Sequence, residues 1–577
     1  MIAFKRLLAA LIALPLAACA TVPQDSGTVT VGLAAFNDFH GSLEPPKLAL
    51  SLPDGAGGTV AVPAGGAAWM ASALDDVRAR YQHHLTVSAG DMIGASQLAS
   101  SLYLDEPTIA AMNRMGLDYA AVGNHEFDRG AAELQRMQAG GCAKYTPREP
   151  CLLEPFAGAR FRFLAASTRL PDGSTLFPAT AIHRFGKGRR AVRVGLIGLT
   201  LAGTPLLVSP EGIAGLTFAD EAETINALVP KLKRAGADAV VVLIHEGGRQ
   251  AAGQADPNAC EGLSGAITGI VERLVPGVDA VVSGHTHAAY VCAREGAPLL
   301  TSAGLYGAMV TEIALEIDPR ASRVVSRRAV NRVVQSEGFT GPRGAVAPSD
   351  AAPRLPPRAD IAALVSRYAQ GAEAQARRPV GRLSGPATRD EALRMLGGTI
   401  GNLIADGQLA ATRAAGAEIA LMNPFGIRAP LVPAADGTVT FGDLYRVQPF
   451  GNQVVTLSMT GAELKAALEQ GFDDLGPDQA LSPSAGLTYG FDPSRPVGDR
   501  IVDLAFNGAP LDPARVLRVT VNGFLALGGD GFSVFAGMPD RVTGPTDIEA
   551  FEAWFRHAPL REVPQEERVL PYSTTRK

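Results

Sequence analysis

The chain has 577 residues, which is too long for one hydrophobic core and allows roughly two to four domains. With 47% hydrophobic and 19% charged residues, its composition is that of an ordinary globular protein. The net charge of -5 provides no basic surface for a nucleic acid duplex or an anionic membrane, so we expect small-molecule partners and a local site for any phosphate group.

The first 18 residues are predicted to be a signal peptide. Lys5 and Arg6 precede an apolar stretch, residues 7–18, which is too short to span a bilayer. Leu16-Ala17-Ala18-Cys19 resembles the bacterial lipobox, which implies lipidation of Cys19 and a tether over residues 19–27. Ordinary cleavage near Ala18 to Ala20 is the alternative. We therefore expect a protein secreted across the inner membrane, either periplasmic or an outer-membrane lipoprotein that touches the membrane only through its anchor.

Residues 28–335 alternate apolar, strand-like runs with helical segments, a pattern that predicts an α/β domain. A stretch rich in Pro, Gly, Ala and Arg follows, and with the helix expected after it we assign residues 336–378 to a linker. The helices expected in these two parts are Ala67–Tyr81, Glu106–Met115, Asp220–Ala235 and Ala359–Arg378.

Residues 379–558 are expected to form a second domain of the α/β or α+β class. Residues 559–577 read as a loose polar tail. The second domain is expected to contain the helices Thr399–Ala414 and Gly461–Gly471 and the strands Glu418–Met422, Gln453–Met459 and Val516–Val521.

Four cysteines remain beyond Cys19, an even number for an oxidising compartment, and they allow three disulfide connectivities. Pairing of Cys142 with Cys151 would close a short loop, and pairing of Cys260 with Cys292 would brace the segment around His285 and His287. Zinc binding is the competing interpretation, but no Cys-x-x-Cys spacing supports it.

Short polar clusters follow seven of the strand-like runs. Because ligands bind at the carboxyl ends of strands in open α/β sheets, clusters far apart in sequence can meet at one edge. The clusters are residues 38–40, 90–91, 124–128, 245, 284–287, 423–428 and 528–531. The first five supply only carboxylate, imidazole and amide side chains as possible ligands. This set favours a site with two divalent metal ions, roughly 3.5–4 Å apart, that hydrolyses a phosphate ester.

Asp91 is the natural bridging ligand, because a carboxylate can use both oxygens. The i, i+2 spacing of Asp38 with His40, and of His285 with His287, would point each pair to one side of an extended segment. A neutral amide ligand, Asn124, would keep the site from becoming too negative for a phosphate.

The series NDFHG, GD, GNHEFD, IHEG and SGHTH resembles the core of the calcineurin-like metallophosphoesterases. Motifs further along single out the bacterial and animal 5′-nucleotidase family, over about Val29 to Ala550. The resemblance implies a four-layer αββα metallophosphoesterase domain joined by a linker helix to an α/β (α+β) substrate-binding domain. It also implies movement of the second domain to deliver substrate.

The resemblance implies Asp38, His40, Asp91 and His287 around one metal ion, and Asp91, Asn124, His245 and His285 around the other. Zn, Mn, Fe or Co suit such mixed ligands. His125 and Asp128 resemble the family's catalytic pair, in which the imidazole faces the developing charge and the carboxylate orients it.

Asn423-Pro424-Phe425-Gly426-Ile427-Arg428 resembles the family's Asn-x-Gly-Gly-Ile-Arg loop, whose Arg binds phosphate through a bidentate fork. Phe425 stands where the family has Gly, which leaves the substrate open. Residues 401–406 resemble the family's Gly-Asn-Leu-Ile-x-Asp helix start, and in the family a second phosphate-binding Arg lies just upstream of it. The spacing of Arg389 and Arg394 does not decide between them, and we assign Arg389.

Phe450 and Phe524 occupy the positions of the family's base-stacking pair. Gly529-Asp530-Gly531 resembles its ribose-contacting turn, in which Asp530 would accept hydroxyl hydrogen bonds, and a plain Gly-Asp turn is the alternative.

The expected function is hydrolysis of nucleoside 5′-monophosphates for extracytoplasmic nucleotide salvage. Alternative substrates for the same metal site are nucleotide sugars, 2′,3′-cyclic nucleotides, dinucleotides and sulfur-bound compounds. A non-catalytic, lipid-anchored nucleotide-binding protein is the non-enzymatic alternative, but it predicts missing ligands and none is missing. The sequence carries no signal for an oligomeric state.

Overall fold

The computed structural model describes residues 27–571, apart from 55–56, 147, 209, 252–254, 342–343, 390–395 and 475–477. The expected signal peptide, the lipidation site Cys19 and Arg394 lie outside the described residues. Among the described residues, no helix is both long enough and apolar enough to cross a bilayer.

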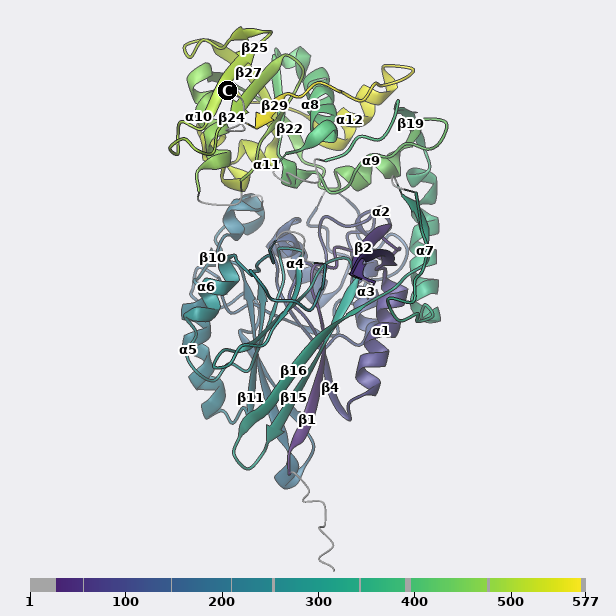
Figure 1. The fold of residues 1–577 in the computed structure, drawn as a ribbon, viewed down its shortest axis with the longest axis vertical. Coiled ribbons are helices and arrows are strands. Elements are labelled where there is room, and N and C mark those ends of the chain that lie inside the picture. The colour runs from purple at the N-terminus through teal and green to yellow at the C-terminus, as the bar shows by residue number, and fades with distance from the viewer. Residues whose placement is uncertain are drawn as a thin grey trace, which may run out of the picture.

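Two six-stranded sheets pack face to face in the N-terminal part of the chain, the lower part of Figure 1. In spatial order the first sheet contains β16 (Arg323–Val333), β15 (Met309–Asp318), β1 (Val29–Phe36), β4 (His83–Ser88), β5 (Tyr119–Ala121) and β6 (Arg162–Leu164). The second contains β13 (Ala289–Cys292), β14 (Leu299–Ala303), β12 (Ala280–Ser283), β11 (Ala239–His245), β9 (Val192–Thr200) and β8 (Thr180–Phe185).

Buried aliphatic side chains such as Leu33 on β1 and Leu243 on β11 fill the space between these sheets. Helices cover the two outer faces, and the expected four-layer αββα arrangement is confirmed. The first sheet is covered by α1 (Ala67–Ala79), α3 (Glu106–Met115) and α4 (Ala131–Ala139), and the second by α5 (Glu221–Arg234) and α6 (Ala266–Glu272).

The sequence accounts for these helix limits. At the start of α5, the Asp220 carboxylate accepts a hydrogen bond from the backbone N–H of Glu223, and acidic residues in the first turn and basic residues in the last match the helix dipole. At the end of α3, Gly116 adopts the left-handed conformation that stops a helix.

Both sheets have a parallel centre. Strands β1, β4, β5 and β6 run parallel in the first sheet, as do β9, β11, β12 and β14 in the second. Their carboxyl ends therefore share one edge of the sandwich, and that edge faces the C-terminal part of the chain (Figure 1). The remaining elements of this half are the short helix α2 (Leu98–Ser101) and the strand pairs β2 (Leu48–Pro53) with β3 (Thr59–Ala64) and β7 (Thr168–Arg169) with β10 (Thr217–Phe218).

The expected linker helix is present as α7 (Ala359–Ala376). Its apolar residues Ile361, Leu364 and Tyr368 are buried in the same core as α1 and α3, so the helix belongs to the N-terminal body. The segment before it is not wholly irregular, because β17 (Phe339–Gly341) and β18 (Gly344–Val346) form a hairpin there.

The C-terminal domain is built on a mixed five-stranded sheet with apolar cores on both faces. Its order is β23 (Ser482–Pro483), β20 (Ile419–Met422), β27 (Val516–Asn522), β22 (Gln453–Thr460) and β28 (Val542–Thr546). Smaller sheets contain β26 (Ala509–Pro510), β25 (Ile501–Phe506), β24 (Leu487–Phe491) and β29 (Val569–Pro571), and β19 (Pro379–Arg382) with β21 (Thr438–Thr440). The helices are α8 (Gly398–Thr412), α9 (Phe441–Val447), α10 (Gly461–Glu469), α11 (Gly523–Ala526) and α12 (Asp547–Arg556).

The expectation of a loose tail after residue 558 is wrong for the described part of it. Strand β29 pairs in parallel with β24, and Val563 is buried in an apolar core of this domain. Arg568, which is 3% exposed, donates two hydrogen bonds to the carboxylate of Asp406, at 2.8 and 2.9 Å. The segment looked polar in sequence because the burial of Val563 and the pairing of Arg568 with Asp406 depend on the fold.

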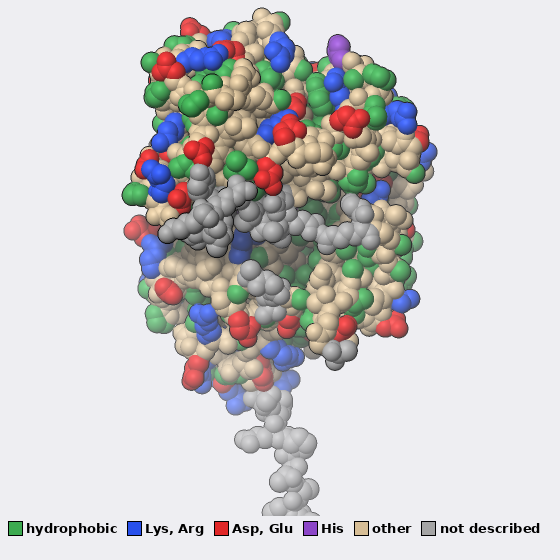
Figure 2. Space-filling view, turned by 45° about the horizontal axis from the view of Figure 1, so that its top comes forward, with side chains coloured by type: hydrophobic (Ala, Val, Ile, Leu, Met, Phe, Trp, Pro, Cys, Tyr) green, Lys and Arg blue, Asp and Glu red, His purple; other side chains and the backbone are tan. Residues whose placement is uncertain are grey.

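Two disulfides join Cys142 to Cys151 and Cys260 to Cys292, one of the three possible connectivities. On the face seen in Figure 2, acidic and basic side chains are interspersed over both domains, without a continuous basic patch among the described residues drawn there.

Candidate active site

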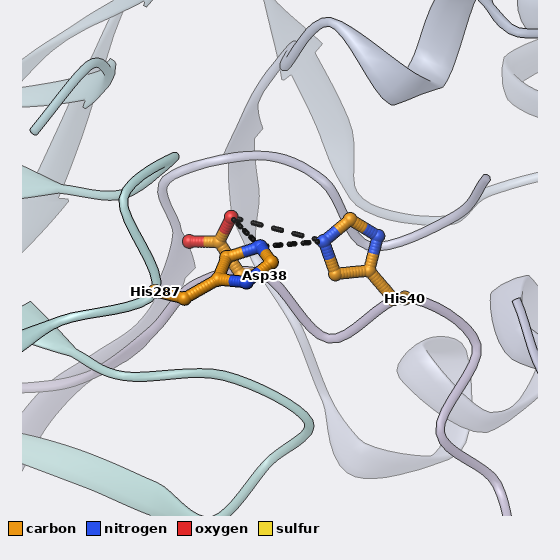
Figure 3. Close-up of side chains that lie close together, drawn as sticks. All are labelled: Asp38, His40 and His287. Carbon is orange, nitrogen blue, oxygen red and sulfur yellow. Dashed lines mark hydrogen bonds and ion pairs between the residues drawn. The ribbon is translucent and has the colours of Figure 1, made fainter. Parts of the chain in front are cut away.

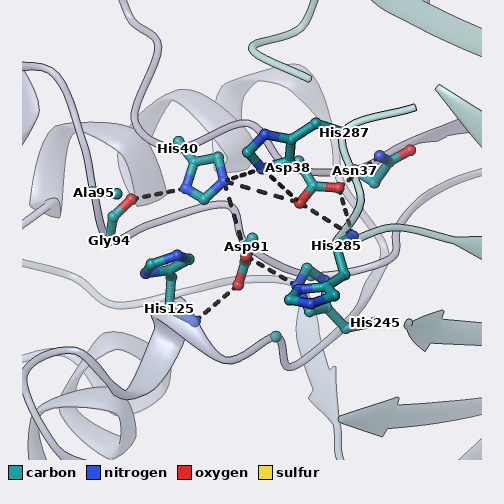
Figure 4. A network of polar contacts seen from close by, with 12 residues as sticks. Asn37, Asp38, His40, Asp91, Gly94, Ala95, His125, His245, His285 and His287 are labelled. Carbon is teal, nitrogen blue, oxygen red and sulfur yellow. Dashed lines mark hydrogen bonds and ion pairs between the residues drawn. The ribbon is translucent and has the colours of Figure 1, made fainter. Parts of the chain in front are cut away.

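Seven polar side chains converge at the carboxyl ends of β1, β4, β5, β11 and β12 (Figure 4). On one side, His287 Nε2 lies 3.4 Å from Asp38 Oδ1 and 3.1 Å from His40 Nε2 (Figure 3). On the other side, His245 Nε2 lies 2.9 Å from Asp91 Oδ2, with His285 in the same group. Asp91 lies between the two groups, since His40 Nε2 is also 3.8 Å from its Oδ2.

The ligand segments are not extended, so the expected reason for the i, i+2 geometry is wrong. Asp38, His40, Asp91, His285 and His287 all have positive φ angles, between 48° and 67°. Such left-handed residues are uncommon outside glycine and mark turns that are held by their surroundings. Strands β1, β4 and β12 therefore each end in a tight turn that directs polar side chains into the site.

The donor set fits divalent metal ions. His40 Nδ1 lies 3.0 Å from the carbonyl oxygen of Gly94, and His245 Nδ1 lies 2.8 Å from that of Ala89. A carbonyl can only accept, so both Nδ1 atoms carry the proton and both Nε2 lone pairs point into the site. There the lone pair of His245 faces a carboxylate oxygen. The buried Asn124 Oδ1 also has no hydrogen-bond partner. A cation would satisfy all of these acceptors.

The pKa shifts in the cluster also favour a bound cation. Burial would raise the pKa of Asp38, but the hydrogen bond with His287 and nearby histidine charges hold it at about 2. Burial lowers the pKa of His285 to about 3, so this imidazole stays neutral, the form that binds metals. Burial opposes protonation of His245 too, yet the adjacent Asp91 carboxylate raises its pKa to about 10, so without a metal ion a proton takes the place that a cation would occupy on Nε2.

The expected catalytic pair lies beside this cluster. His125 Nδ1 is 3.0 Å from both carboxylate oxygens of Asp128, and the backbone N–H of His125 donates to Asp91 Oδ1 at 2.9 Å. Although burial lowers the pKa of His125, the negative charges of Asp128 and Asp91 outweigh it and raise the pKa above its usual value. The geometry suits an imidazole that meets a developing negative charge.

The C-terminal domain contributes an arginine and an aromatic ring to the same place. The Phe450 ring stacks on His125 with ring centres 5.8 Å apart and planes inclined by 21°. The Arg428 guanidinium lies 5.8 Å from the centre of the Phe450 ring, and its buried Nη2 has no hydrogen-bond partner. Burial lowers the pKa of His40, and the charge of Arg428 lowers it further. An unsatisfied guanidinium that faces a histidine cluster is suited to an anionic ligand.

Asn423 and Asp530 form a polar pair near this arginine. Asn423 Nδ2 donates to Asp530 Oδ2 at 2.7 Å, and Asn522 Nδ2 donates to Asn423 Oδ1 at 2.9 Å. Burial raises the pKa of Asp530 to about 6. The half-buried Phe524 packs against the same turn, because a Cβ at Gly529 would lie 2.5 Å from its ring.

Arg389 lies behind the Arg428 loop: its Nη1 donates to the carbonyl oxygen of Ile427 at 3.1 Å. This contact supports the loop from behind. The described residues therefore bring together fourteen of the fifteen expected catalytic, metal-binding and substrate-binding residues around one interface, with Arg389 in a supporting position.

Sequence reasoning missed Glu126, which shapes the turn around Asp91. Its buried carboxylate accepts hydrogen bonds from the backbone N–H groups of Asp91 and Met92, each at 2.8 Å, and of Gly123 at 2.6 Å. It also missed Asn37, whose Nδ2 donates to Asp38 Oδ2 at 2.7 Å. Both are neighbours of expected ligands, and that proximity was the available signal.

Known proteins resemble the chain in both halves. Residues 33–289 match the family model for calcineurin-like phosphoesterases, and residues 379–537 match the model for the 5′-nucleotidase C-terminal domain. The chain is 27% identical over 570 residues to the snake venom 5′-nucleotidase of Gloydius brevicauda, covering 92% of this chain and 87% of that protein.

A bacterial relative is much longer than this chain. The Endonuclease YhcR of Bacillus subtilis is 30% identical over 541 residues, which are 92% of this chain but 40% of that protein. The crystal structure of a 5′-nucleotidase precursor from Thermus thermophilus matches with a TM-score of 0.73 at 28% identity, over 94% of this chain and 99% of that one.

Proposed function

The chain belongs to the 5′-nucleotidase family, with a calcineurin-like phosphoesterase domain ahead of a 5′-nucleotidase C-terminal domain, and from this premise we propose that it hydrolyses nucleoside 5′-monophosphates to nucleoside and phosphate. The observation that carries the proposal is the meeting of two half-sites. A cluster of metal-type ligands with His125 on one domain lies opposite Arg428 and Phe450 on the other.

Two divalent cations would be held by Asp38, His40, Asp91 and His287, and by Asp91, Asn124, His245 and His285. Zn, Mn, Fe or Co suit these ligands. When bound, such ions polarise phosphoryl oxygens and activate water for attack on phosphorus.

The chain's own residues supply the rest of the site. Arg428 binds phosphoryl oxygens through its free guanidinium nitrogen, because no protein group satisfies that atom. His125, held by Asp128 through Nδ1, presents Nε2 to the oxygen that gains charge as the ester bond breaks. Phe450 and Phe524 offer flat faces to a nucleobase, and Asp530 accepts hydrogen bonds from ribose hydroxyls.

Phe425 favours a second candidate substrate within the same chemistry. It is half-buried in the loop of Asn423 and Arg428, where the family has Gly. A ring at this position changes the space next to the phosphate-binding arginine. Nucleotide sugars, 2′,3′-cyclic nucleotides, dinucleotides or sulfur-bound compounds are therefore the alternatives.

An extracytoplasmic location is part of the proposal. Two disulfides within one chain suit an oxidising compartment, where a salvage enzyme meets external nucleotides. The N-terminal segment with Lys5, Arg6 and Cys19 supports export and a lipid anchor.

The test is hydrolysis by the full mature chain with added Mn, Zn or Co, followed by separation of the products, because only a nucleoside monophosphate releases orthophosphate in one step. Substrates are 5′-AMP, UDP-glucose, cyclic AMP isomers and, because one relative is named an endonuclease, single-stranded DNA. We expect 5′-AMP to be preferred and His125→Ala to lose about a hundredfold or more. His557→Ala, at an exposed position on the second domain, is the control and should keep full activity. Preference for another substrate would overturn the assignment of the nucleotide. No turnover with two metals bound would favour a binding protein.

A further inference from the structure

One buried polar contact joins the two domains. Ser101 ends α2 in the N-terminal domain and Tyr445 lies on α9 in the C-terminal domain, and their hydroxyl groups are hydrogen-bonded to each other. Ser101 is 2% exposed and Tyr445 is 3% exposed, so water does not compete for this bond. Next to it, Leu98 of α2 packs against apolar cores of both domains. The short helix α2 is therefore one of the places where the second domain docks.

The direction of each hydrogen bond around this contact follows from its partners. The Tyr445 hydroxyl is 3.0 Å from the carbonyl oxygen of Pro449. A carbonyl oxygen can only accept, so Tyr445 donates its single hydroxyl proton to it. Ser101 must then donate to Tyr445. The Ser101 oxygen accepts in turn from Arg129 Nη2, at 3.1 Å. The side chains of Arg129, Ser101 and Tyr445 form one series of hydrogen bonds, in which each donates to the next. Loss of either hydroxyl group leaves a buried neighbour without its partner.

Both ends of this series of hydrogen bonds lead to the active site. At the N-terminal end, Arg129 forms an ion pair with the buried Asp105, whose Oδ2 accepts from the backbone N–H of Gly94 at 3.4 Å. The carbonyl oxygen of Gly94 accepts from Nδ1 of the metal-ligand candidate His40. At the other end, Pro449 immediately precedes Phe450, the ring that stacks on His125.

We propose that the Ser101–Tyr445 hydrogen bond is the latch that holds the two domains together, and that Tyr445 is a positioning residue that keeps Phe450 over His125. The Tyr445 hydroxyl group is hydrogen-bonded to Ser101 and to the carbonyl oxygen of Pro449, and it acts through that carbonyl group. Domain docking and placement of the aromatic ring are thereby coupled through one hydroxyl group. The part of this proposal that concerns turnover rests on the proposed phosphohydrolase function, whereas the latch itself does not.

The latch is tested by hydrogen–deuterium exchange on the full chain without substrate. Tyr445→Phe should speed amide exchange in residues 98–105 and 449–452 by roughly threefold to tenfold, the range for one net hydrogen bond. Exchange in residues 98–105 reports on the opposite domain, so local damage around Tyr445 would not move it. Ser101→Ala removes the same bond from the other side, and the double variant should match the more affected single variant.

Tyr489→Phe is the matched control, because Tyr489 is also buried in the second domain and donates to a carbonyl within that domain, Leu481, at 2.8 Å. It should leave exchange in residues 98–105 unchanged. Unchanged exchange there in Tyr445→Phe, or an equal increase in Tyr489→Phe, would overturn the latch.

Turnover is then measured with whichever phosphoester the wild-type chain hydrolyses. Tyr445→Phe should lower kcat by roughly threefold to tenfold, with a smaller change in KM, because Phe450 is displaced from His125. If exchange changes and kcat does not, the positioning role is wrong and the latch stands. If the wild-type chain hydrolyses no phosphoester, the proposed function fails and the exchange result is unaffected.

Discussion

The backbone around the metal-ligand candidates leaves no room for side chains where glycine stands. A Cβ added to Gly123 would lie 2.2 Å from Asp91 Oδ1 and 2.7 Å from the backbone nitrogen of Asp91. One contact is with main chain, so rotation of a side chain cannot relieve the clash. Asp91, the residue between the two ligand groups, is thus held against a bare backbone.

Gly123→Ala should therefore displace Asp91 and weaken metal binding. We expect metal affinity and activity to fall by about 10- to 100-fold, which is the range for changes to the groups that hold metal ligands in place. The measurement is metal content by mass spectrometry beside phosphate release. Gly269→Ala in α6 is the control, since a Cβ there meets nothing within 4 Å. It should keep its metals and gain about 0.5–1 kcal/mol of helix stability. Full metal content in Gly123→Ala would contradict this account of the turn.

Asp547 is a buried carboxyl group away from the metal ligands whose titration should change the stability of the fold with pH. Its carboxyl group at the start of α12 is 2% exposed, and burial raises its pKa from 3.8 to about 7 although it accepts a hydrogen bond from the N–H of Ile548. The native state thus binds a proton that the unfolded chain releases between about pH 4 and pH 7. Stability from this group is present at low pH and is lost as the pH rises through about 7.

Asp547→Asn cannot lose that proton. Relative to wild type, the variant should become progressively more stable as the pH rises from about 5 to about 7, by roughly 1.4 kcal/mol per pH unit, because wild type loses its bound proton on unfolding over this range. Denaturant unfolding at several pH values measures the difference. Asp540→Asn, at an exposed position, should follow the wild-type profile. Parallel curves for Asp547→Asn and wild type would show that Asp547 is ionised in the fold.

For single residues, the sequence identified the site side chains that are polar and stand at the end of an apolar strand. Asp91, His245 and His287 stand out because apolar runs precede them. Glu126 did not stand out, because its role depends on backbone N–H groups from another strand end. The left-handed turns at the ligands were also unpredictable, since Asp and His rarely adopt them without support from the fold.

At the scale of elements, helices with clear start and stop signals were predicted almost to the residue. The expected Glu106–Met115 is α3 itself, and the expected Asp220–Ala235 is α5 with one residue less at each end. The hairpin of β17 and β18 was missed, because its sequence is rich in Gly and Pro and lacks the alternation that predicts strands. Local pattern therefore sufficed only where propensity and packing agreed.

The disulfide between Cys260 and Cys292 joins the segment between β11 and α6 to β13. The two cysteines are 32 residues apart, and Cys292 lies on β13, which follows His285 and His287 in the sequence. The other disulfide joins Cys142 and Cys151, which are 9 residues apart and lie in another part of the sequence. In the chain-entropy account the longer loop contributes about 4 kcal/mol and the shorter about 3 kcal/mol.

Replacing Cys260 and Cys292 by alanine should therefore lower both stability and metal retention. Replacing Cys142 and Cys151 should lower stability alone. Denaturant unfolding and metal content of the two double variants separate these outcomes. Equal loss of metal from both variants would show that general destabilisation, and not the brace beside His287, controls metal binding.

At the scale of the whole molecule, the site is a property of the interface. The sequence predicted that ligands and substrate-binding residues lie on different domains, because their motifs fall in separate segments. It could not predict the Ser101–Tyr445 contact, since a serine and a tyrosine carry no signal until the domains dock. The same holds for Arg568, whose burial depends on the carboxylate of Asp406 in a distant helix.

The C-terminal segment gives the clearest test of this larger-scale dependence. Deleting residues 559–577 removes β29 and Val563, and it leaves Asp406 of α8 without the two hydrogen bonds from Arg568. Fully burying a valine side chain is worth about 1.5–3 kcal/mol, and the deletion also leaves the Asp406 carboxylate, which is 17% exposed, without its cationic partner. The second domain should therefore unfold at lower denaturant concentration, while the first domain keeps its metals. Deleting only residues 572–577 is the control and should change neither property. If the longer deletion is as stable as the shorter one, the segment is a loose tail and the pairing of Arg568 with Asp406 does not stabilise the domain.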